Sequence, residues 1–102
     1  MDAQLKRSLL PFCILKLLQK EDRYEYDIVK LIQEYFSETD QRTIYAVLRR
    51  LRKEGLTTTY QVSVSGGPSR KYDHLSELGI QRLNDYAQSW ELISKFIEKL
   101  GV

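Results

Sequence analysis

Between Thr39 and Gly55 the apolar residues recur at helical spacing, and many of the other positions are positively charged. Positions i, i+3, i+4 and i+7 are filled by Ile44, Val47, Leu48 and Leu51. That spacing places them along one stripe of a helix, which is typical of a buried face. The side-chain oxygens of Thr39 and Asp40 suit the start of such a helix, and Gly55 suits its end. The pattern predicts one amphipathic helix over residues 40–55.

Two helical segments precede this helix. Residues 3–20 carry apolar side chains on more than one face, so a helix there needs more than one neighbour. Pro11 lies inside this segment and indicates either a kink or the true start of the buried helix, with residues 3–10 as a separate arm. After a charged turn at residues 21–23, a second apolar stripe predicts a helix from about Tyr24 to Phe36.

The pattern then changes from helical spacing to that of strands. Residues 56–64 are rich in β-branched and aromatic side chains, which predicts a strand, and residues 70–75 predict its returning partner. The Gly, Ser and Pro residues at 65–69 indicate a turn or a flexible loop between them. Ser76 is a good N-cap for a long helix that reaches about Leu100.

Apolar residues of this last helix are spaced 3, 4, 3, 4 and 3 apart, which is the seam of a helix–helix interface. The seam consists of Leu83, Tyr86, Trp90, Ile93, Ile97 and Leu100. The alternative is a helix that lies on its own domain. A helix of this length spans about 37 Å, however, and would overhang a small core, so its apolar surface needs a second chain. We therefore expect a homodimer whose interface includes Leu5, Leu9, Leu83, Trp90, Ile97 and Leu100.

Charge is distributed unevenly along the chain. The formal net charge is only +2, but residues 39–71 hold seven Lys or Arg and two Asp or Glu, while the remainder has a net charge of −3. The predicted helix alone carries Arg42, Arg49, Arg50, Arg52 and Lys53. An ordinary solvated helix is the alternative, although such helices usually mix their charges through i,i+4 pairs. Clustered positive charge favours a polyanionic partner.

The composition argues against several other classes of protein. A length of 102 residues, 42% of them hydrophobic, fits one domain with a core. The single Cys13 and single His74 cannot build the usual zinc site, and any catalytic triad would depend on that one histidine. We expect no catalytic residue, no metal site and no cofactor. Lacking a signal peptide or a run of about 20 apolar residues, the chain is expected to be cytoplasmic, without a membrane partner.

The order helix, helix, basic helix, hairpin, long helix is that of a winged helix-turn-helix, a mainly α (α+β) fold. We expect a DNA-binding domain at residues 1–75 and a dimerisation helix at residues 76–102. The basic helix would enter the major groove of double-stranded operator DNA, and the hairpin would reach the backbone or the minor groove. The expected DNA-binding residues are Gln41, Arg42, Thr43, Tyr45, Arg49, Arg50, Lys53, Arg70 and Lys71. For Tyr45 a half-buried packing role is the alternative, and for the hairpin cations it is solvated charge.

Several motifs resemble those of a known family. Residues 43–56, TIYAVLRRLRKEGL, are similar to the recognition helix of the PadR family of bacterial transcriptional regulators. GGPSRKY at residues 66–72, followed by LSELG at 75–79, resembles its wing, and YEYDI at 24–28 resembles the opening of its second helix. With a single C-terminal helix, the chain looks like the short subfamily that includes a multidrug-responsive lactococcal repressor. It departs at Arg42, where the family usually has a small residue, and at Glu25, where it usually has Gly.

That resemblance implies a homodimeric repressor in which the C-terminal helix packs against the first helix of the partner chain. In the multidrug-binding members, planar aromatic compounds stack between paired tryptophans at the dimer centre, and Trp90 stands at the matching position. The residues implied to line such a site are Ser8, Phe12, Tyr86, Trp90, Ile93 and Ser94. The alternative for Trp90 is that it simply fills the interface. A protein of another class, a winged-helix interaction module without DNA binding, is the alternative for the whole chain.

Overall fold

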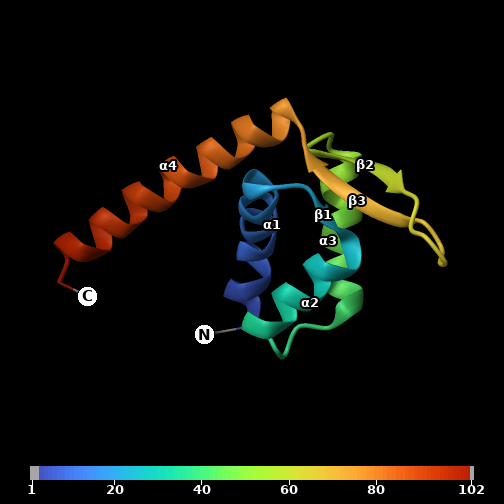
Figure 1. Cartoon of the computed structure of the whole chain (residues 1–102). Helices are drawn as coiled ribbons and strands as arrows, with labels where there is room; N and C mark the ends of the chain where they lie inside the picture. The colour runs from blue at the N-terminus through green and yellow to red at the C-terminus, as the bar shows by residue number, and fades with distance from the viewer. Residues whose placement is uncertain (1–2, 102) are drawn as a thin grey trace.

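The computed structural model describes residues 3–101, which form four helices and a three-stranded antiparallel sheet (Figure 1). In chain order the elements are α1 (Ala3–Lys20), β1 (Arg23–Tyr24), α2 (Glu25–Tyr35), α3 (Gln41–Lys53), β2 (Thr57–Val62), β3 (Arg70–Leu75) and α4 (Glu77–Lys99). This arrangement confirms the predicted mainly helical winged helix-turn-helix. The wing is the hairpin of β2 and β3.

The predicted amphipathic helix is α3, and of the residues expected at its ends Asp40 and Gly55 take those roles, whereas Thr39 is buried ahead of the helix. The side chain of Asp40 accepts a hydrogen bond of 2.8 Å from the backbone N–H of Arg42. Gly55 follows the helix with a φ of 76°, in the left-handed region that residues with a Cβ disfavour. Local interactions therefore determine both ends of the helix.

α1 is continuous across Pro11. It runs for 18 residues, and the proline itself is buried within it. Of the two possibilities left open by the sequence, a separate arm at residues 3–10 is therefore wrong, because the described part of that segment belongs to the same helix.

The sheet contains a strand that the sequence analysis missed. Arg23, which we assigned to a charged turn, forms with Tyr24 the short strand β1 at the edge of the sheet. It pairs antiparallel with β3, so that Arg23 faces Asp73 and Tyr24 faces Tyr72. Two residues are too few to show an alternating pattern, and the strand exists only because β3 offers it a partner.

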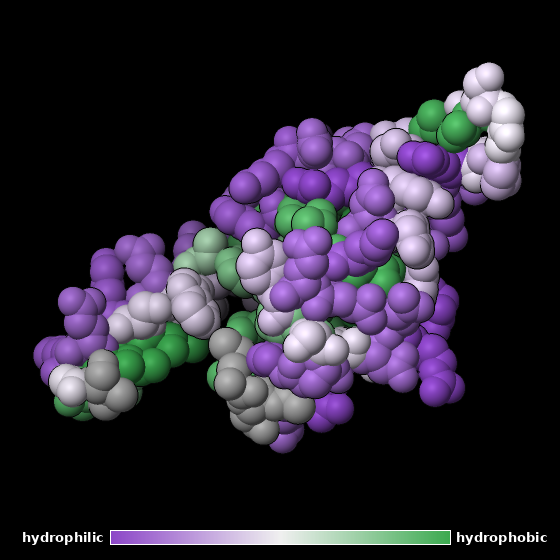
Figure 2. Space-filling model, turned by 60° about the horizontal axis from the view of Figure 1, so that its bottom comes forward, coloured by the Kyte–Doolittle hydropathy of each residue, from purple (hydrophilic) through white to green (hydrophobic). Residues whose placement is uncertain are grey.

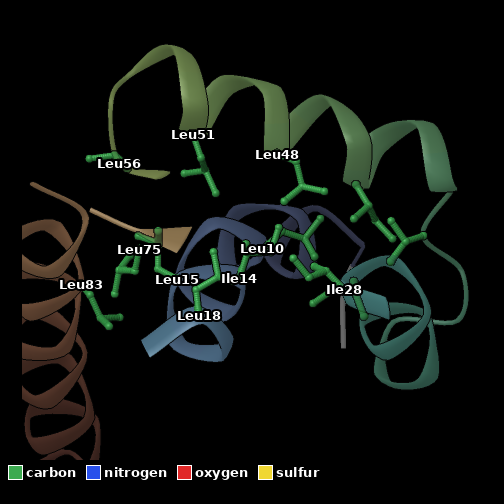
Figure 3. Packing of buried hydrophobic residues seen from close by; sticks show 13 residues of the cluster. Leu10, Ile14, Leu15, Leu18, Ile28, Leu48, Leu51, Leu56, Leu75 and Leu83 are labelled. Carbon is green, nitrogen blue, oxygen red and sulfur yellow. The ribbon is translucent and has the colours of Figure 1, made fainter. Parts of the chain in front are cut away.

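The core lies where α1, α2, α3 and the sheet meet. Leu48 and Leu51 of α3 point toward α1, whose Leu10 and Ile14 are fully buried (Figure 3). Leu83, near the start of α4, belongs to the same cluster and is only 2% exposed. The first turns of α4 are therefore part of the winged-helix body.

The rest of α4 projects away from that body (Figure 1). From position 87 to position 101 every residue is exposed. The large apolar side chains among them are Trp90, Leu92, Ile93, Phe96, Ile97 and Leu100. Figure 2 shows apolar side chains gathered along one side of the projecting helix. The overhang that the length of this helix predicts is therefore present.

Gly79, in the first turn of α4, packs directly against the chain at Leu56. A Cβ at Gly79 would lie 2.1 Å from the carbonyl oxygen of Leu56 and 2.6 Å from Cδ1 of Leu75. The nearest of these atoms belongs to the backbone and cannot rotate away. Glycine at this position therefore allows α4 to approach the winged-helix body.

We expect Gly79→Ala to lower the free energy of unfolding by about 2 kcal/mol, because the clash outweighs the roughly 1 kcal/mol by which alanine favours a helix. Urea denaturation measures this change. Gly67→Ala is the matched control, since its Cβ would meet nothing within 4 Å, and it should change stability by less than about 0.5 kcal/mol. Equal urea midpoints for the wild type and Gly79→Ala would contradict the close packing of α4.

Candidate nucleic-acid interface

The buried stripe of α3 determines which of its side chains face solvent. Ile44, Leu48 and Leu51 are buried, so the opposite side of the helix is left exposed. The predicted DNA-binding residues that lie fully exposed on α3 are Gln41, Arg42, Arg49, Arg50 and Lys53. Thr43 and Tyr45 are half-buried at the border. The helix therefore presents a mostly cationic polar face.

The cations of this face are held only loosely by carboxylates. Arg42, whose side chain is 93% exposed, lies 3.7 Å from Asp40, and Arg50 lies 3.6 Å from Glu54. Within residues 3–101, Arg49 and Lys53 have no ion pair. Exposed pairs of this kind contribute about 0–1 kcal/mol, so all four cations remain available to a polyanion.

Tyr45 combines a packing role with a hydroxyl that has no hydrogen-bond partner among residues 3–101. Its ring packs against the core cluster. Burial first, and then the nearby Glu25 carboxylate, raise the pKa of the Tyr45 hydroxyl above its usual value. The hydroxyl is therefore protonated at neutral pH and can donate a hydrogen bond to a phosphate oxygen.

Arg52 is the exception among the cations of α3, because it points inward. Its Nε and Nη2 each donate a 2.9 Å hydrogen bond to the carboxylate of Asp73, and Nη2 also donates to Glu25. Asp73 is fully buried. Sequence reasoning counted Arg52 with the cations of the helix, since its position shows only that it lies outside the apolar stripe. We found no sequence signal for this cluster.

The wing brings two further predicted cations to the surface. Arg70 begins β3 and is exposed, and its guanidinium lies 4.9 Å from the ring centre of Tyr24. Lys71 is the next residue and is half-buried. The loop at the wing tip, residues 65–69, is fully exposed, and Gly66 has a φ of 76° that the turn requires. Arg70 pairs with Val62 at the end of the hairpin next to this loop, so the wing presents positive charge beside a small, exposed tip.

A row of tyrosines crosses the sheet, and sequence reasoning missed it. The strand register places Tyr24 beside Tyr72 and Tyr72 beside Tyr60. Their ring centres are 6.1 Å and 5.6 Å apart, and the Tyr60–Tyr72 pair is stacked. Tyr26 of α2 extends the row, 6.1 Å from Tyr24. The row was not predictable without β1, because the pairing of this edge strand with β3 places Tyr24 beside Tyr72.

A carboxylate anchors one side of this sheet. Tyr60 donates a hydrogen bond of 2.7 Å to Asp22, and Nδ1 of His74 lies 2.8 Å from the other oxygen of that carboxylate. Burial alone would raise the pKa of Asp22, but these hydrogen bonds outweigh it and lower the pKa below its usual value. The same bond to Asp22 raises the pKa of Tyr60. The turn after α1 is thereby attached to both strands of the wing.

A small hollow lies between α1 and α4, where the resemblance implied an effector site. It measures about 150 Å³ and is lined by Ser8, Leu9, Phe12, Tyr86, Ser89, Trp90 and Ile93. Phe12 and Tyr86 meet edge to face at 5.8 Å. Five of the six residues expected there come together in this hollow, while Ser94 does not line it. Trp90 lines one side of the hollow and is itself 54% exposed to solvent.

The expected dimer residues divide into exposed and covered positions. Leu5, Trp90, Ile97 and Leu100 are exposed, and Leu9 is half-buried. Leu83 is already covered by its own chain, so its side chain has no surface left to offer to a partner. The spacing of the seam could not reveal this, because helical periodicity does not distinguish an intramolecular neighbour from an intermolecular one.

A larger apolar groove lies between α1 and α2, and no pattern in the sequence indicated it. Its volume is about 490 Å³, and its lining residues are Cys13, Lys16, Leu17, Arg23, Leu31, Ile32, Tyr35 and Phe36. Burial raises the pKa of the Cys13 thiol, which makes it a poor nucleophile at neutral pH. Residues 3–101 hold no group of three or more His, Cys, Asp or Glu placed to bind a metal ion. None of their helices is long and apolar enough to cross a membrane.

Comparison with known proteins agrees with this architecture. The model of the transcriptional regulator PadR-like family matches residues 14–85. An uncharacterized protein of Lysinibacillus sphaericus is 35% identical over 101 residues, which cover 92% of this chain and 93% of that one.

Solved structures show the same fold. A PadR-like transcriptional regulator from Bacillus cereus superposes with a TM-score of 0.85 at 30% identity, covering 96% of each chain. A PadR family regulator from Clostridium difficile gives a TM-score of 0.80 at 29% identity over 90% of this chain and 97% of that one. The chain therefore belongs to the PadR-like family of transcriptional regulators, which are DNA-binding proteins and not enzymes.

Proposed function

We propose that this chain is a homodimeric repressor that reads operator DNA with α3 and the wing, and that a planar aromatic effector at the dimer interface releases it. The observation that carries the DNA-binding part is the exposed cationic face of α3. In this proposal residues 1–75 bind DNA and residues 76–102 dimerise. A regulator works where its DNA lies, so we also propose a cytoplasmic location.

On DNA, the polar face of α3 lies in the major groove. Gln41, Arg42 and Thr43 in the first turn face base edges, where a recognition helix usually reads sequence. Arg49, Arg50 and Lys53 neutralise phosphates, and Tyr45 donates a hydrogen bond to one. Arg70 and Lys71 bring the wing to the backbone or the minor groove. The nine positions thus divide between sequence reading and backbone contact.

The second copy covers the exposed half of α4. Six large apolar side chains beyond position 87 face solvent in the single chain, and such a patch is rare on a monomer. The interface we propose contains Leu5, Leu9, Trp90, Ile97 and Leu100. In a two-fold dimer the recognition helices would reach two half-sites about 34 Å apart, one turn of the duplex.

The hollow beside Trp90 supports an effector site. Its wall is mostly apolar and aromatic, and a two-fold axis near Trp90 would join two copies of the hollow into one cavity. Planar aromatic molecules can then stack on the tryptophan rings. Ser8, Phe12, Tyr86 and Ile93 would complete the wall, with Ser94 farther along α4.

We expect Arg49→Ala to weaken DNA binding without changing the oligomeric state, because Arg49 is exposed on α3 and outside both apolar surfaces. Loss of one phosphate contact should reduce the log–log salt slope of binding by about 0.9. Fluorescence anisotropy with a duplex selected from a random-sequence library measures both quantities.

Lys99→Ala is the matched control, because it removes an exposed cation at the far end of α4 and should leave the slope unchanged. A salt-insensitive complex of the wild type would instead favour a protein-interaction module. If Arg49→Ala became monomeric in light scattering, its assignment to the DNA face would be incorrect.

We expect Trp90→Ala to raise the dimer dissociation constant at least about tenfold, because truncating a large interface aromatic typically costs more than 1–2 kcal/mol. Sedimentation velocity across a range of concentrations measures this constant. Tyr26→Ala is the matched control, since Tyr26 is an exposed aromatic on α2. Its dissociation constant should equal that of the wild type.

Titration with Hoechst dye, followed through the fluorescence of the single tryptophan, tests the effector site separately. Saturable quenching with loss of operator binding is the expected result. Absence of quenching would mean that Trp90 is a packing residue and not part of an effector site. If the dimer dissociation constant of Trp90→Ala also equalled that of the wild type, Trp90 would not belong to the interface either.

A further inference from the structure

Three charged side chains from three different elements meet beneath the proposed DNA surface. Glu25 is the first residue of α2, Arg52 lies in the last turn of α3, and Asp73 lies in the middle of β3. The guanidinium of Arg52 donates two parallel hydrogen bonds of 2.9 Å to Asp73 and a third to Glu25. Arg52 and Glu25 are mostly covered, and Asp73 is fully covered. We name these three residues the Arg52 cluster.

The Arg52 cluster affects the relative orientation of α3 and β3 more than it contributes to the free energy of unfolding. A buried ion pair recovers little beyond the energy needed to dehydrate its charges, and apolar residues could pack the same elements equally well. A guanidinium bound at two atoms by one carboxylate, however, fixes the relative angle of the two groups. Arg23, the cation opposite Asp73 in the strand register, donates instead to the carbonyl of Leu17.

The position of the cluster connects the two groups of proposed DNA cations. Arg52 lies next to Lys53 and three residues after Arg49 on α3. Asp73 lies on β3 only two residues after Lys71 and three after Arg70. The bidentate pair therefore joins the recognition helix directly to the middle of β3. Glu25 ties the same guanidinium to α2.

We propose that Arg52 is a positioning residue that holds the wing at a fixed angle to α3, so that both groups of cations engage one duplex together. Arg52 itself makes no DNA contact. The inference rests on the proposed placement of α3 and the wing on DNA. Glu25 extends the same link to α2.

A double-mutant cycle on the full-length protein tests the positioning role. The change in DNA affinity caused by Arg70→Ala is measured in the wild type and in Arg52→Lys. Lysine keeps the positive charge against Asp73, so the protein should fold, but its ammonium cannot form the two-point contact. Circular dichroism melting confirms folding, and Glu25→Gln, which leaves the Arg52–Asp73 pair intact, is the second variant.

The expected result is that Arg70→Ala weakens binding to a library-selected duplex about tenfold in the wild type and less than about threefold in Arg52→Lys. In Glu25→Gln the loss should fall between these values. Arg49→Ala should cost the same in all three backgrounds, because Arg49 reaches DNA without the wing. If Arg52 only supported folding, Arg52→Lys would lower the DNA affinity of every variant by the same factor. The loss caused by Arg70→Ala would then be equal in the wild type and in Arg52→Lys.

Equal losses from Arg70→Ala in the wild type and in Arg52→Lys would overturn the positioning role while leaving the proposed interface intact. If neither Arg49→Ala nor Arg70→Ala changed binding in the wild type, the proposed interface itself would be incorrect, and the positioning role would be overturned with it. The two failures are therefore distinguishable.

Discussion

Burial of one stripe of α3 against α1 is the constraint on which the rest of the structure depends. Ile44, Leu48 and Leu51 occupy the core beneath the helix, so its cationic side can only face outward. The wing follows from the same packing, because β3 is joined to α3 through Arg52 and Asp73. The packing of α3 against α1 thus determines which way the side chains that we assign to DNA face.

α4 combines two environments along one helix. Its first turns complete the core of its own chain through Gly79 and Leu83, whereas positions 87–101 are all exposed. Because the first turns of α4 are packed in the core, they fix the direction of its exposed apolar end. That direction in turn determines how a second chain bound to this end is oriented. In the proposed dimer, the same rigid element would therefore connect the effector hollow near Trp90 to the spacing of the two recognition helices.

Features determined by local chemistry could be predicted from the sequence, and features determined by distant pairing could not. The cap at Asp40, the end at Gly55 and the N-cap at Ser76 depend on neighbouring residues, and they were predicted correctly. β1 was missed because its existence depends on β3, about 50 residues later. The inward direction of Arg52 likewise depends on Asp73, and the covered state of Leu83 depends on the core.

Hydroxyl-radical footprinting of the wild-type protein on a library-selected duplex tests the central claim most directly. A dimer that reads DNA with α3 should protect two patches whose centres lie about one helical turn, 10–10.5 base pairs, apart on one face of the duplex. Protection flanking each patch would correspond to the wings. A single protected patch, or protection spread evenly along the duplex, would contradict a dimer that reads two half-sites.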